Sequence, residues 1–133
     1  EPWLDEGLTT YSSGLYYEIA EGPYAFEGLL SYWQSRYDRL LQKGQDAPIN
    51  WSVSEFEQQA PEAYAPIAYS KAALFFDALR REVGDEAFFA ALRIYYEQNQ
   101  FTIALSDDLQ AAFAQTAGTE IESLFSQWLE QAP

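Results

Sequence analysis

The chain has 133 residues, of which 48% are hydrophobic and 17% aromatic, so it suits one domain with a core of large rings and is not a disordered chain. Its formal charge of −14 argues against nucleic acid or an anionic membrane as a partner. The charge would attract a cationic ligand such as a peptide amino terminus, although solubility alone is the simpler explanation for it. The sequence contains no cysteine and no histidine, which excludes a disulfide, a thiolate metal site and an imidazole base within this chain.

Apolar residues recur at helical spacing through most of the chain. The first predicted helix ends at Gly22 and Pro23, and its apolar positions share one face: Leu4, Leu8, Tyr11, Leu15 and Ile19. A second amphipathic helix follows and closes at Gly44. Residues 45–61 are predicted as a loop with one short helix, because prolines interrupt the periodicity there.

The middle of the chain predicts two consecutive helices. The third helix covers about residues 66–83, with Pro66 tolerated in its first turn. Gly84 is the expected terminator, and Asp85 is the expected cap of the fourth helix. The fourth helix carries the apolar residues Phe88, Phe89, Leu92, Ile94, Tyr95 and Tyr96.

The last part of the chain predicts two more helices. A fifth begins near Ser106 and ends at Gly118. Thr119 and Glu122 form a capping-box pattern for a sixth helix. The side chains expected to be buried on that helix are Leu124, Phe125, Trp128 and Leu129.

These patterns predict an all-α fold, with a single helical domain of about six helices over residues 1–133. No alternating segment is long enough for a strand. No apolar run is long enough to span a bilayer, and the first residues do not form a signal peptide, so the sequence does not predict a cellular location.

A few polar side chains could carry chemistry. Glu6 lies in the first turn of the first predicted helix, where it is either a metal ligand or an acidic residue favoured by the helix dipole. Tyr64 and Tyr69 flank a proline, and a tyrosine hydroxyl at a helix start can donate to a developing oxyanion. The simpler alternative is a core tyrosine whose hydroxyl binds a carbonyl. Lys71 is expected to extend along the surface with its ammonium group in solvent.

Three segments together are more specific than any single residue. They are WLDEGLTTY (3–11), YSKAALFFDALRREVGDEAFFAALRIYYEQNQF (69–101) and SDDLQAAFAQTAGTEIESLFSQWL (106–129). In content and order they resemble the Trp-Leu-Asn-Glu-Gly segment, the Tyr-x-Lys-Gly block and the Phe-x-Gln-Trp-Leu end of the M1 family of zinc aminopeptidases, the gluzincins. The resemblance covers nearly the whole chain and is weakest across about residues 20–60.

The resemblance implies a role for Glu6 as the third zinc ligand and for Tyr69 as the residue that stabilises the tetrahedral oxyanion. It also implies the C-terminal, helical lobe of a thermolysin-like catalytic domain. The family's His-Glu-x-x-His motif, which supplies two zinc ligands and the general base, stands before this segment. We therefore expect a fragment whose partners are a peptide substrate and the upstream part of the same polypeptide. The isolated chain is expected to bind no zinc and to be inactive.

Some positions depart from the family pattern. Asp5 replaces the usual Asn, Ala72 replaces the Gly after the Tyr-x-Lys motif, and Ser13 stands where many members have a Glu that supports a histidine ligand. The departures leave open a catalytically dead relative that serves as a peptide-binding or scaffold module. An acidic helical adaptor with accidental similarity is a third alternative.

The expected loss of the upstream helix also predicts self-association. In the isolated chain, we expect an exposed apolar face that includes Trp3, Leu4, Leu8 and either Tyr16 or Tyr69.

Overall fold

The computed structural model describes residues 1–118 and 121–130, and within these ranges every regular element is a helix, as predicted. The elements in chain order are α1 (Pro2–Glu21), α2 (Pro23–Gln42), α3 (Val53–Gln59), the 3₁₀ turn η1 (Pro61–Ala63), the π-helix η2 (Pro66–Lys71), α4 (Ala72–Asn99), α5 (Ser106–Ala117) and α6 (Glu122–Leu129). None of the helices in these ranges is long and apolar enough to cross a membrane.

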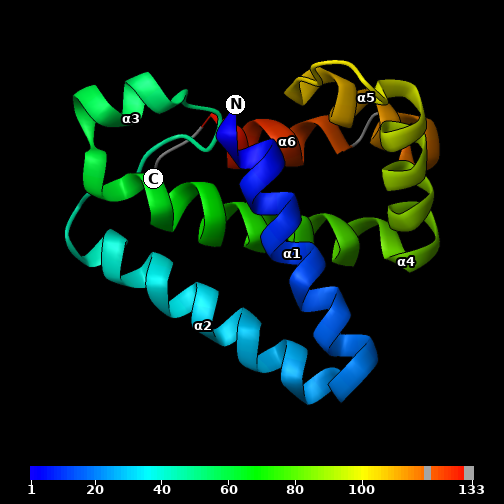
Figure 1. Ribbon diagram of the computed structural model, residues 1–133, viewed down its shortest axis with the longest axis horizontal. Helices are drawn as coiled ribbons and strands as arrows, with labels where there is room; N and C mark the ends of the chain where they lie inside the picture. Colours follow the sequence, from blue (N-terminus) through cyan, green and yellow to red (C-terminus); the bar gives the residue numbers. More distant parts are fainter. Residues whose placement is uncertain (119–120, 131–133) are drawn as a thin grey trace.

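The long helix α4 organises the molecule (Figure 1). Helix α1 crosses it, and α2 runs back from the end of α1 to pack against η2 and the first part of α4. Helix α5 packs on α4 near its far end, while α3 lies beside the start of the η2–α4 segment. The arrangement places residues from the beginning and the middle of the chain side by side where α1 meets η2.

The predicted helix boundaries are largely confirmed. Gly22 separates α1 from α2 with a φ of 94°, a conformation that favours glycine. Gly84 has a φ of 79° and breaks α4 where the sequence predicts two helices. The predicted short helix in the loop is α3. Thr119, half of the predicted capping box of the last helix, lies outside the described residues.

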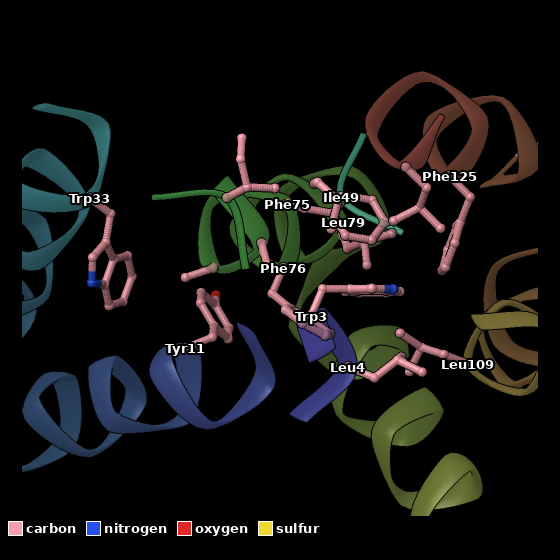
Figure 2. Packing of buried hydrophobic residues seen from close by; sticks show 14 of the residues in the cluster. Trp3, Leu4, Tyr11, Trp33, Ile49, Phe75, Phe76, Leu79, Leu109 and Phe125 are labelled. Carbon is pink, nitrogen blue, oxygen red and sulfur yellow. The ribbon is translucent and has the colours of Figure 1, made fainter. Parts of the chain in front are cut away.

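Large rings fill the core, as the composition predicts (Figure 2). Trp3 of α1 is fully buried, with its ring centroid 5.6 Å from that of Phe75 and 5.8 Å from that of Phe76. Phe75 in turn lies 5.1 Å from Phe125 of α6. The Trp3 indole Nε1 also donates to the Ser106 hydroxyl at the start of α5 (3.2 Å). The first turn of α1 is therefore a central part of the core.

Two expectations about α1 are wrong. Trp3 and Leu4 were expected on an exposed face of the isolated chain, but both are buried because α4 and α5 cover the start of α1. Ile19 was expected on the buried face, but its side chain is 87% exposed. The last turn of α1 still contacts α4 through the Glu18–Arg80 ion pair, but the Ile19 side chain faces solvent and is not covered. Tyr16 is exposed as predicted, and Leu8 is half-buried.

Candidate metal and substrate site

Tyr69 lies in the middle of the π-helix η2. The helical path begins before Pro66 rather than at it. A proline inside a helix removes one N–H donor and crowds the carbonyl four residues earlier, and the wider turn of a π-helix accommodates both effects. Single π turns inside α-helices are rare and occur often at functional sites. Pro66 is compatible with the π-helix, and Tyr69 therefore lies on a backbone that differs from the α-helix predicted there.

Glu6 reaches this region because α1 approaches η2 closely. Its neighbour Gly7 is buried against the junction of η2 and α4. A Cβ atom built on Gly7 would lie 2.5 Å from the Ala72 Cβ and 3.4 Å from the Ala68 carbonyl oxygen. Only a glycine permits this approach without a shift of the backbone.

The packing of α1 on η2 places Glu6 and Tyr69 near one another. The interaction of the Tyr69 hydroxyl with the Glu6 carboxylate is the main reason that the pKa of Tyr69 is raised to about 12. Desolvation and the negative charge of Glu6 act in the same direction. Both side chains are half-buried, so they remain open to solvent on one side. At neutral pH the phenol is protonated and able to donate a hydrogen bond.

The other residues of the predicted site have different surroundings. Tyr64 packs its ring against that of Tyr69, with the centroids 6.2 Å apart, so it supports the site rather than extending it. Ser13 is exposed and donates its hydroxyl hydrogen bond to the Thr9 carbonyl (3.0 Å). Asp5 is exposed beside Glu6.

The prediction that Lys71 lies at the surface is wrong. Its side chain is 3% exposed and forms an ion pair with Asp46, with 3.0 Å between Nζ and Oδ1. Sequence reasoning missed Asp46 altogether, because it lies in an irregular loop with no motif around it. The one relevant feature of the sequence is the lysine of the Tyr-x-Lys motif. That motif does not indicate which residue pairs with Lys71 or that its side chain is buried.

The donor set available for a metal is small. Within residues 1–118 and 121–130, no three carboxylate, imidazole or thiol side chains are grouped so that they could hold a metal ion. Glu6 offers one carboxylate with a hydrogen-bond donor beside it.

Comparison with known proteins gives the family. The peptidase family M1 domain matches residues 1–128. The chain belongs to the peptidase family M1. This M1 domain segment is also 28% identical to aminopeptidase N of Streptomyces lividans over 136 residues, which cover 98% of the chain.

Two further relatives give the same picture. Aminopeptidase N of Lactococcus lactis subsp. lactis is 37% identical over 65 residues, or 49% of the chain, and aminopeptidase M1-C of Oryza sativa is 24% identical over 97% of it. The chain spans 15% of the length of the Streptomyces and Oryza proteins and 8% of the Lactococcus protein. No solved structure matches the M1 segment significantly.

Proposed function

We propose that this M1 segment forms part of a zinc-dependent aminopeptidase, to which Glu6 contributes a metal ligand and Tyr69 an oxyanion-stabilising hydroxyl. The observation that carries the proposal is the close packing of α1 on η2, which places Glu6 near Tyr69 although the two residues are far apart in the sequence. Both positions coincide with the motifs through which the sequence resembles the family. The names of the relatives, aminopeptidase N and aminopeptidase M1-C, support peptide hydrolysis from the amino terminus as the reaction.

The zinc ion is proposed from the donor chemistry and the family. Catalytic zinc sites commonly use two His and one Glu, with a fourth position left for water or substrate. This chain has a suitably placed carboxylate in Glu6 and no His, so the two imidazoles would come from a His-Glu-x-x-His segment in the same polypeptide. When bound, zinc polarises the scissile carbonyl and lowers the pKa of a water molecule.

The protein side chains have distinct tasks in this proposal. Glu6 supplies negative charge and one oxygen atom to the metal. Tyr69 donates a hydrogen bond to the carbonyl oxygen as negative charge develops on it. The Tyr69 hydroxyl lies near enough to the Glu6 carboxylate for that carboxylate to raise its pKa, so it is placed to act on a substrate held next to Glu6. Removing one such donor costs about 3–4 kcal/mol of transition-state stabilisation.

The alternative is a catalytically dead relative that binds peptides or acts as a scaffold. Two departures from the family pattern, Ala72 and Ser13, favour this alternative. The structure accommodates Ala72, because its methyl group packs against Gly7, which has no side chain. Ser13 remains as the observation that favours the alternative, because it is exposed and interacts only within its own helix in the contacts described above.

The test uses the full-length protein that contains this segment. We expect Tyr69→Phe to reduce the hydrolysis of an aminoacyl p-nitroanilide about 100- to 1,000-fold while the zinc content stays unchanged. Tyr64→Phe is the matched control, since it removes a hydroxyl from the neighbouring ring and should leave turnover near the wild-type value. Equal turnover in wild type and Tyr69→Phe would remove Tyr69 from the mechanism. An inactive wild-type protein that still binds peptides would favour the scaffold alternative.

A further inference from the structure

A buried ion pair lies at the C-terminal end of the π-helix that carries Tyr69. The Lys71 Nζ is 3.0 Å from Oδ1 and 3.1 Å from Oδ2 of Asp46, and it also donates to the Ala47 carbonyl (3.0 Å). The two charged side chains are only 3% and 5% exposed. Lys71 therefore ties the last residue of η2 to the loop between α2 and α3.

The same cluster includes Tyr37 of α2. Its hydroxyl donates to Oδ2 of Asp46 (2.9 Å), and the Lys71 ammonium lies 5.3 Å from the centroid of its ring. Asp46 thus accepts hydrogen bonds from both neighbours, while the ammonium also gains a cation–π contact. Three elements, α2, the loop and η2, meet at this one carboxylate.

A row of aromatic rings connects the same loop to Tyr69. Trp51 packs against Phe56 with centroids 5.4 Å apart, Phe56 packs against Tyr64 at 5.5 Å, and Tyr64 packs against Tyr69 at 6.2 Å. All three contacts are edge-to-face. The loop that carries Asp46 therefore also supports the ring of Tyr69.

We propose that the Lys71–Asp46 ion pair is a positioning device that holds η2 in its π-helical register and so keeps the Tyr69 hydroxyl against Glu6. A π turn is a rare alternative to the α-helix. Relaxation of η2 into a regular α-helix would change its register by one residue, a rotation of about 100° around the helix axis. Such a rotation would turn the Tyr69 hydroxyl away from α1.

The choice of an ion pair agrees with this role. A buried ion pair contributes little net stability compared with a well-packed apolar pair, because both charges lose their hydration. The ion pair does fix the relative position of the two segments, because each buried charge keeps its partner only while the side chains hold this arrangement. Lys71 is two residues from Tyr69 and shares its helix, so that geometry is passed directly to the hydroxyl. The inference rests on the proposed function only in one respect, namely that the position of the Tyr69 hydroxyl matters for catalysis.

The test compares the wild-type chain with the Asp46→Asn/Lys71→Met double variant, which removes both charges together. The readout is NMR of the chain with labelled tyrosines, in which nuclear Overhauser contacts between the Tyr69 ring and the Glu6 side chain report their proximity. We expect the double variant to remain helical and to lose these contacts, with a changed Tyr69 ring shift. The exposed Tyr16 ring should be unaffected.

A second ion pair provides the matched control. Arg80 of α4 binds Glu18 of α1 (2.7 Å between Nη1 and Oε2), and the Glu18→Gln/Arg80→Met variant disrupts it without touching η2. This control should keep the Tyr69–Glu6 contacts. If the double variant in Asp46 and Lys71 does not fold, Asp46→Asn, which retains an oxygen acceptor for the Lys71 ammonium, is a second variant and is judged by the same contacts. Retention of the Tyr69–Glu6 contacts in a folded variant would overturn the inference.

A kinetic measurement separates this inference from the proposed function. In the full-length enzyme, Asp46→Asn should lower kcat with little change in KM or zinc content. Loss of the Tyr69–Glu6 contacts with no change in kcat would support the positioning role and contradict the catalytic role of Tyr69. A fall in kcat with the contacts intact would contradict the positioning role alone.

Discussion

Gly7 of α1 faces Ala72 at the start of α4 with no room for another methyl group. The Ala72 Cβ occupies the space that a side chain on residue 7 would need, at 2.5 Å from the ideal Cβ position. This pair sets how closely α1 approaches η2. Glu6 is the residue directly before Gly7, and Tyr69 lies three residues before Ala72. The packing of two small residues therefore controls the distance between two candidate functional ones.

Gly7→Ala should destabilise the protein. Overpacking typically lowers the free energy of unfolding by about 1–3 kcal/mol. The better helix propensity of alanine offsets about 1 kcal/mol of this loss. Gly28→Ala is the control, because a Cβ there meets nothing within 4 Å, and it should be neutral or stabilising. Urea unfolding monitored by circular dichroism measures both variants.

The Gly7→Ala/Ala72→Gly variant tests the contact itself. It moves the methyl group from one side of the interface to the other, so the two substitutions should be coupled by about 0.5–3 kcal/mol in the stabilising direction. Additive effects of the two substitutions would show that the methyl groups do not meet.

The capping box of α3 should make stability depend on pH. The Ser52 backbone N–H donates to Glu55 Oε2 (2.7 Å), its hydroxyl donates to the same atom (2.8 Å), and both bonds lower the pKa of Glu55. Since the folded pKa lies below the unfolded value of about 4.3, the stabilisation is present above that value and is lost as the pH falls through the folded pKa.

Denaturant midpoints of wild type and Glu55→Ala measure this effect. We expect the difference between the two midpoints to be larger at pH 7 than in acid below the lowered pKa. The Glu57→Ala variant removes a carboxylate from the same helix without touching the capping box and serves as the control. A wild-type advantage that stays constant from pH 7 into acid would show that the ionised Glu55 does not contribute.

The 133-residue chain by itself should not hydrolyse peptides. It offers one candidate metal ligand in Glu6 and contains no histidine to complete the set or to act as a base. The measurement is hydrolysis of an aminoacyl p-nitroanilide by the pure chain, with and without added zinc. Turnover that a chelator abolishes would show that the chain builds a metal site of its own.

The helices were predictable because their signals are local. Gly22 and Gly84 terminate helices through their own backbone preferences, and the buried rings follow the helical period. Burial along α1 was less predictable, because it depends on where other elements cross it. The same predicted helix face carries Leu4, which is buried, and Ile19, which is exposed.

The candidate site was predictable only through family resemblance. Periodicity and composition gave no reason to place Glu6 next to Tyr69. They also allowed Glu6 to be an acidic residue favoured by the helix dipole and Tyr69 to be an ordinary core tyrosine. Asp46 could not be predicted at all, since its importance lies in a tertiary contact with Lys71 across an irregular loop. The π-helical form of η2 is likewise a compromise between Pro66 and the surrounding packing that no local pattern specifies.

The zinc content of the purified full-length protein tests the central claim most directly. Elemental analysis would compare wild type with Glu6→Ala and with Asp5→Ala, which removes the exposed neighbouring carboxylate as a control. The proposed role of Glu6 predicts about one zinc per chain in wild type and in Asp5→Ala, and a large loss of zinc in Glu6→Ala. Full zinc occupancy in a folded Glu6→Ala variant would contradict it.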